Sequence, residues 1–144
     1  MSANLNLPGM KPTKGKKYVD SNVFLYALDK DAFKKSIALD IMESKPIIST
    51  QVINENIHSA IKKFLPKEEA FIHAELLIKM CDVKKISIET IRIAFKISSR
   101  YQYSYFDSLQ IAAALENNCS ILYSEDLQHK QVIEGKLTIV NPFL

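Results

Sequence analysis

Short stretches rich in β-branched and apolar residues alternate with longer stretches of helical periodicity along this chain. The strand-like stretches are 18–20, 46–50, 83–87, 119–123 and 137–140. No Asn-Gly or Asp-Gly pair marks a tight hairpin between any two of them. The alternation therefore predicts an α/β domain, with a mainly parallel central sheet that helices cover on both faces.

The helical stretches are bounded by residues that commonly begin or end helices. Ser49 or Thr50 is the predicted N-cap of a helix in which Ile53, Ile57 and Phe64 recur at helical spacing. A polar segment beginning at Ser124 is also predicted to be helical. The other predicted helices begin at Val23 and cover 32–43, 66–80, 88–100 and 106–117.

The length of the chain limits the number of domains. With 144 residues and 47% apolar content, it fits one domain with an ordinary core. Residues 1–16 are rich in Asn, Pro, Gly, Thr and Lys and show no periodicity, so they are expected to be a disordered leader. The predicted domain covers 17–144.

Several classes of protein do not fit the sequence. No apolar run approaches the length of about 20 residues that a membrane-spanning helix needs, and Met1 to Lys17 do not resemble a signal peptide. A cytoplasmic protein that does not enter the membrane is therefore expected. Cys81 and Cys119 form no metal-binding or disulfide pattern and are predicted to be buried free thiols.

The sequence also argues against several common chemistries. Its glycines, Gly9, Gly15 and Gly135, form no phosphate-binding loop, so binding of ATP or NAD is not expected. The histidines are scattered and no nucleophilic serine motif is present. A net charge of +3 is too small to indicate a nucleic-acid partner by itself.

Acidic residues stand at positions where α/β domains usually carry their sites. In parallel sheets, sites gather beyond the carboxyl ends of the strands. Asp20 follows the first predicted strand and Asp126 follows the fourth, after Ser124. Asp20 could also cap a turn or helix, and Glu125 or Asp126 could complement a helix dipole. At most one of these last two acids is expected to face a site.

Asp107 and Glu55 are more ambiguous. Asp107 begins a helix that is apolar almost all round, so its carboxylate is expected to be partly buried and to need a cation, hydrogen-bond donors or a proton. It could instead cap that helix. Glu55 lies opposite Ile53 and Ile57 on its helix, so periodicity predicts that water surrounds it. Glu55 and His58 form an E-x-x-H pair, but a di-iron site needs a second pair that is absent.

Carboxylates are thus the only reactive groups numerous enough at the strand ends. If several converged, they would repel one another unless cations neutralised them, and oxygen ligands suit Mg²⁺ or Mn²⁺. Divalent ions held in this way promote hydrolysis of phosphodiesters by activating water and stabilising the leaving oxygen.

Four segments together resemble the PIN-domain family. They are Tyr18 to Tyr26, Ile48 to Glu55, Tyr105 to Ala114 and Leu122 to Leu127, and they occur in the family's order over about Lys17 to Phe143. The resemblance implies a three-layer fold.

It also implies that Asp20, Glu55, Asp107 and Asp126 hold one or two Mg²⁺ or Mn²⁺ ions, with Asn22 and Ser124 as supporting groups. For Glu55, the resemblance opposes the interpretation from periodicity.

The activity implied by this resemblance is endoribonuclease cleavage of RNA. The size of the chain is similar to that of VapC-type toxins, which implies an antitoxin partner and a homodimer. Two alternatives remain open. One is a PIN fold with little catalysis that binds nucleic acid or protein, and the other is a nuclease that acts on DNA.

Overall fold

A six-stranded sheet runs through the centre of the computed structural model, which describes residues 15–63 and 65–144. The order of its strands is β3-β2-β1-β4-β6-β5, and every neighbouring pair is parallel except β6 and β5. The strands are β1 (Lys16–Val19), β2 (Ile47–Ser49), β3 (Asp82–Lys84), β4 (Cys119–Tyr123), β5 (Val132–Ile133) and β6 (Leu137–Val140).

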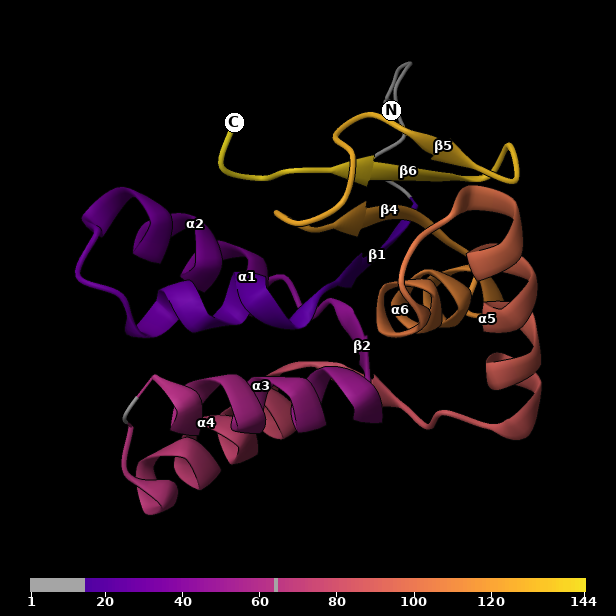
Figure 1. Ribbon diagram of the computed structural model, residues 1–144. Coiled ribbons are helices and arrows are strands. Elements are labelled where there is room, and N and C mark those ends of the chain that lie inside the picture. The colour runs from indigo at the N-terminus through magenta and orange to yellow at the C-terminus, as the bar shows by residue number, and fades with distance from the viewer. Residues whose placement is uncertain (1–14, 64) are drawn as a thin grey trace.

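Helices cover both faces of this sheet (Figure 1). Helices α1 to α4 pack against one another on one side, and α5 and α6 form a pair on the other. None of the helices in the described ranges is long and apolar enough to cross a membrane. Their bounds are α1 (Ser21–Leu25), the 3₁₀ turn η2 (Tyr26–Leu28), α2 (Ala32–Glu43), α3 (Thr50–Lys62), α4 (Lys67–Met80), α5 (Ile88–Tyr101) and α6 (Tyr105–Glu116).

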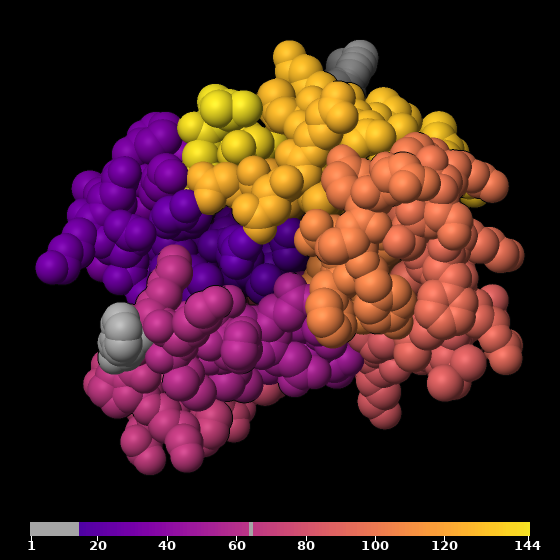
Figure 2. Space-filling model, viewed as in Figure 1, coloured from indigo at the N-terminus to yellow at the C-terminus, as the bar shows by residue number. Residues whose placement is uncertain are grey.

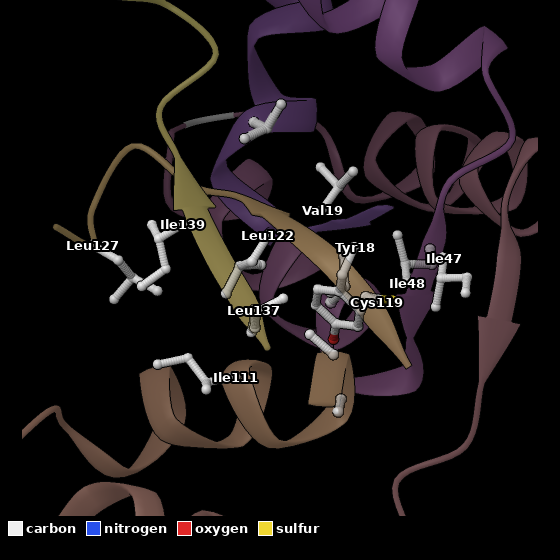
Figure 3. Close-up of a cluster of buried hydrophobic side chains, with 14 of the residues drawn as sticks. Tyr18, Val19, Ile47, Ile48, Ile111, Cys119, Leu122, Leu127, Leu137 and Ile139 are labelled. Carbon is white, nitrogen blue, oxygen red and sulfur yellow. The ribbon is translucent and has the colours of Figure 1, made fainter. Parts of the chain in front are cut away.

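The core lies on both faces of the central strands (Figure 3). Tyr18 and Val19 are neighbours in β1, so their side chains point to opposite faces, yet neither is exposed. Leu122 in β4 and Ile139 in β6 are also fully buried. The predicted α/β class, with a mainly parallel sheet covered on both sides, is therefore confirmed.

Most predicted elements agree with the structure within a few residues. Ser49 is the N-cap of α3, and its hydroxyl accepts hydrogen bonds from the backbone of Gln51 and Val52. The predicted leader lies outside the described residues, except for its last two positions, and β1 begins at Lys16 within it. Cys119 is buried as expected, but Cys81 is only half-buried, and both thiols are free.

The helix predicted to begin at Ser124 is wrong. Ser124 Oγ does accept hydrogen bonds from the backbone of Asp126 and Leu127, as an N-cap would. The chain then turns instead of coiling, and the backbone of Lys130 and Gln131 pairs with that of Ile139. Within the segment, Gln131 N–H also donates to Gln128 O at 3.2 Å, but this single turn does not continue as a helix, because the neighbouring backbone groups bond to Ile139 of β6.

A tight hairpin that the sequence analysis missed explains this difference. Glu134 and Gly135 both have positive φ, at 54° and 65°, and Lys136 N–H donates to Ile133 O at 3.0 Å. Two central residues of positive φ are what a type I′ turn requires, and glycine adopts that conformation without strain. The turn reverses the chain from β5 into β6. Its Glu-Gly pair is not one of the usual hairpin signals, so the sequence analysis did not detect it.

Replacing a central core residue should cost far more stability than replacing a residue on the edge strand. We expect Leu122→Ala to lower the free energy of unfolding by about 2–5 kcal/mol, because it leaves a cavity between packed layers. Val132 in β5 is 52% exposed, and Val132→Ala should change that free energy by about 0.5 kcal/mol or less. Urea denaturation measures both, and equal losses would contradict this assignment of the core.

Candidate active site

Asp20 lies at the carboxyl end of β1, where its carboxylate is almost completely buried, with 4% exposure. It is the N-cap of α1, and its Oδ1 accepts a hydrogen bond from the backbone N–H of Ser21 at 2.7 Å. Its Oδ2 accepts another from the hydroxyl of Ser124, directly after β4, at 3.0 Å. The carboxylate therefore links the ends of two adjacent parallel strands.

Glu55 is held by side chains from three helices. Its Oε1 accepts from Ser21 Oγ in α1 at 3.1 Å. Its Oε2 accepts from Gln51 Nε2 in α3 at 3.0 Å and from Gln110 Nε2 in α6 at 3.3 Å. Glu55 is half-buried, so the interpretation from periodicity, that water surrounds it, is wrong. Polar side chains of α1 and α6 cover this face of α3, and periodicity within one helix cannot reveal them.

Asp107 lies in the first turn of α6 and is half-buried. The N-cap of this helix is Ser104, whose hydroxyl accepts from the backbone N–H of Asp107 at 3.3 Å. Asp107 therefore does not cap its own helix. Burial raises the pKa of its carboxyl group, and the negative charge of Asp126 raises that pKa further, against the opposing effect of Ser104.

Asp126 is exposed and lies in the loop after β4. Its carboxylate accepts a hydrogen bond from Asn22 Nδ2 of α1. The preceding acid, Glu125, has different partners, because it accepts from the hydroxyl of Tyr26 and from Lys34 Nζ at 3.1 Å. The two neighbouring acids are thus held by different partners. That at most one of them faces the site stays a prediction.

Unlike Glu125, the four candidate acids have no cationic partner in the described ranges. Across 15–63 and 65–144, none of the four acids Asp20, Glu55, Asp107 and Asp126 forms an ion pair. The pKa of Asp20 is raised to about 7, first by burial and then by the charges of Glu55 and Asp107, although the hydrogen bonds from Ser124 and Ser21 oppose this. The carboxylates therefore influence one another electrostatically.

The acids do not form a closed metal-binding cluster. In the part of the chain that the structure describes, no three acidic, histidine or cysteine side chains are grouped as ligands for an ion. The donor set nevertheless fits a hard divalent cation, because it consists of carboxylate oxygens with uncompensated charge.

Four further residues of the site were missed by the sequence analysis: Ser21, Gln51, Gln110 and Tyr18. The hydroxyl of Tyr18 lies within hydrogen-bonding reach of Gln110 Oε1 and, at 2.8 Å, of Ser49 Oγ. With its Oε1 facing Tyr18, Gln110 presents its amide nitrogen to Glu55. One signal was available in the sequence, because Gln110 interrupts the apolar run from Leu109 to Leu115. In the structure its side chain is only 1% exposed.

The segments that carry the acids meet on one face of the molecule. Figure 2 shows the indigo start of the domain, the magenta α3 region, the orange α6 region and the yellow-orange loop after β4 around a central hollow. This is the carboxyl edge of β1, β2 and β4, the edge at which parallel sheets carry their sites.

Comparisons with solved structures identify proteins of the same fold. VapC20 of Mycobacterium tuberculosis, described as a toxin that cleaves the sarcin-ricin loop, is 16% identical with a TM-score of 0.64, over 77% of this chain and 90% of that one. A toxin-antitoxin complex from Klebsiella pneumoniae is 17% identical with a TM-score of 0.67, over 88% and 98%. DNA-bound VapBC from Salmonella typhimurium is 18% identical with a TM-score of 0.65, over 86% and 96%.

Comparison with protein families gives the more direct assignment. No curated protein matches the sequence of this chain. The family model of the PIN domain, in contrast, matches residues 17–134. This match spans β1 to the β5–β6 hairpin and includes all four acids, so the chain belongs to the PIN-domain family.

Proposed function

We propose that this protein is a metal-dependent endoribonuclease and the toxin of a toxin-antitoxin pair. The observation that carries the proposal is a set of four carboxylates at the carboxyl edge of a PIN-domain sheet, none of which forms an ion pair with a residue that the structure describes. Asp20, Glu55, Asp107 and Asp126 would hold Mg²⁺ or Mn²⁺. A bound ion of this kind supplies a more acidic water as the nucleophile and offsets negative charge on the phosphodiester.

The hydrogen bonds of the site give each acid a distinct task in this proposal. Ser124 and the backbone of Ser21 fix both oxygens of Asp20, which makes it the most rigid of the four. Gln51 and Gln110 both donate to one oxygen of Glu55, so they orient its carboxylate as a ligand or as a base that orients water. Asp107 would be the second principal ligand.

Asp126 and its neighbours complete the set. Asn22 donates to the carboxylate of Asp126, and Ser124 accepts from its backbone N–H at 3.2 Å. Tyr26 and Lys34 hold the adjacent Glu125, which restrains the same loop from the outer side. These contacts therefore hold the exposed carboxylate of Asp126 at a position from which it would bind the metal ion.

The assignment as a toxin comes from the structural neighbours. Their descriptions name a VapC toxin and complexes of toxin with antitoxin, and this chain covers 90–98% of the length of those three chains. An antitoxin protein is accordingly the proposed partner, RNA the proposed substrate and the cytoplasm the proposed place of action. A homodimer stays a prediction.

Two alternatives differ in their observable behaviour. A PIN fold that only binds nucleic acid or protein would have no need of a complete set of acids, and here all four are present. A nuclease for DNA would use the same residues. The substrate and the need for a metal are therefore tested together.

Replacing Asp107 should abolish cleavage without unfolding the protein. With a fluorescent RNA of mixed sequence, wild type should cleave in Mg²⁺ or Mn²⁺ and not in EDTA, with a DNA of the same sequence as comparison. Asp107→Asn should lower the rate by about a hundredfold or more, the usual scale for losing one group that stabilises charge in a transition state. Asp40, an exposed acid of α2, provides the control variant Asp40→Asn, which should keep full activity.

Three results would count against this assignment. They are cleavage that persists in EDTA, cleavage that survives Asp107→Asn, and a well-folded wild type that cleaves no RNA. The last result would favour the module that only binds. Cleavage of DNA but not of RNA would leave the proposed metal site in place and show that the substrate is DNA.

Asp20 should make the metal-free protein less stable as the pH rises. Its pKa in the folded protein is about 7, against 3.8 ordinarily, so the folded state holds this proton more tightly than the unfolded chain. The contribution of Asp20 to stability is therefore lost as the pH rises from about 4 through 7. In EDTA at pH 8, Asp20→Asn should raise the free energy of unfolding by about 1–3 kcal/mol, and near pH 4 it should change it little.

Metal should reverse this effect only in proteins that retain Asp20. Mn²⁺ binding to the folded state should raise the Tm of wild type and of Asp40→Asn, but not that of Asp20→Asn. Thermal denaturation at pH 8, with and without Mn²⁺, measures both effects. A variant that is destabilised equally at pH 4 and pH 8 would show that Asp20 serves structure only.

A further inference from the structure

Three aromatic side chains form an exposed cluster beside the acidic site. Phe95 of α5 is 57% exposed, and Tyr105 and Phe106 of α6 are 36% and 57% exposed. Their ring centroids are 6.1 Å apart between Phe95 and Tyr105 and 5.5 Å apart between Tyr105 and Phe106. We call these three residues the aromatic cluster.

The turn between α5 and α6 brings the cluster together. Helix α5 ends at Tyr101, and its C-cap, Gln102, has the left-handed φ of 64°. Helix α6 begins at Tyr105 and packs against α5. The opposite face of α5 is buried through Ala94 and Ile97, so Phe95 is left on the outside. The exposure of its ring therefore follows from the helix geometry.

The aromatic cluster is also joined covalently to the site. Tyr105 and Phe106 are the first two residues of α6, and Asp107 is the third. Phe106 and Asp107 lie about 100° apart around the helix axis, so the ring is exposed while the carboxylate is half-buried. A nucleotide held against Phe106 would therefore lie next to a carboxylate of the proposed active site.

The pairing of these rings with one another distinguishes them from the other exposed aromatic residues that the structure describes. Single exposed apolar side chains are normal, but a contiguous group usually marks a binding surface. Phe33 and Phe71 are similarly exposed, at 62% and 48%, yet neither pairs with another ring in the described ranges. Phe71 shares α4 with other exposed apolar residues, Ile72, Leu76 and Ile78. Because neither phenylalanine has a paired ring in those ranges, the two provide controls for ring stacking.

Positive charge accompanies the cluster. A shallow hollow of about 480 Å³ beside Phe95 is lined by Lys96, Ser99 and Arg100. Arg100 is paired with Glu134 at 2.6 Å, whereas Lys96 forms no ion pair with any residue that the structure describes. The exposed ring of Phe95 is a surface on which a nucleotide base can stack. The neighbouring ammonium group of Lys96 is a cation that a backbone phosphate can contact.

We propose that Phe95, Tyr105 and Phe106, beside the acidic site, are a platform on which unpaired RNA bases stack, and that Lys96, next to Phe95, contacts the RNA backbone. The inference rests on the proposed ribonuclease function and adds that the substrate is single-stranded where it binds. Bases of a duplex are already stacked, so their faces are not accessible to side chains. Stacking on aromatic rings tolerates any base because every base has a π-face.

Binding is measured in EDTA so that cleavage does not interfere. The probe is a short fluorescein-labelled RNA of mixed sequence, used both single-stranded and annealed to its complement, with the full chain. Phe95→Ala/Phe106→Ala should weaken binding of the single strand by about tenfold or more and affect the duplex much less. Phe33→Ala/Phe71→Ala should leave binding of both forms unchanged.

A second measurement distinguishes stacking from a merely structural effect. A 2-aminopurine base in the single strand should lose fluorescence when wild type binds, and the Phe95→Ala/Phe106→Ala variant should not produce this loss. Phe95→Trp/Phe106→Trp should restore both binding and the loss of fluorescence, since a larger ring still stacks. The Tm of each variant verifies folding.

The outcomes separate this inference from the proposed function. If wild type cleaves RNA while the double alanine variant binds the single strand as tightly as wild type does, the platform is wrong and the ribonuclease assignment stands. If wild type neither binds nor cleaves RNA, both the stacking platform and the ribonuclease assignment are wrong. If the double alanine substitution dissociates a dimer and single-strand binding is intact, the cluster is an interface between copies and the platform is overturned.

Discussion

The site depends on one costly feature, the burial of the Asp20 carboxylate at the end of β1. A buried carboxylate needs hydrogen bonds to offset lost hydration, and here the N–H of Ser21 and the hydroxyl of Ser124 supply them. They do not meet the whole cost, since the pKa of Asp20 is still raised to about 7. The fully buried core of β1 and β4 on both faces of the sheet holds the group in place despite this strain.

The same constraint connects Asp20 to the rest of the site. Ser21 donates its backbone N–H to Asp20 and its hydroxyl to Glu55, so one residue relates the two acids. Behind Glu55, the buried Tyr18 hydroxyl fixes Gln110, which donates to the same carboxylate. Hydrogen-bonded chains of this kind make the position of each acid depend on the packing of β1 against its neighbours, which links the stability of the sheet to the geometry of the site.

Positions that depend on neighbouring residues in the sequence could be predicted, whereas positions that depend on contacts with distant segments could not. Asp20 and Ser124 follow strands directly, so their place at one edge of the sheet was predictable. Glu55 was misjudged from periodicity because its partners come from α1 and α6. The segment after Ser124 begins like a helix but pairs with β6, because the turn at Glu134 and Gly135 returns the chain alongside it. The catalytic roles of the four acids stay predictions.

The beginning of α6 shows how one turn of helix can serve two purposes. Ser104 caps this helix end. The pKa of Asp107 is nevertheless raised, because burial and the charge of Asp126 outweigh the hydrogen bond with Ser104. Such a carboxylate gains most from an added cation. Phe106 immediately before it remains exposed because the helix turns about 100° per residue. A rigid, capped helix end can thus present a ligand group inward and a stacking surface outward at a fixed spacing, which a flexible loop could not maintain.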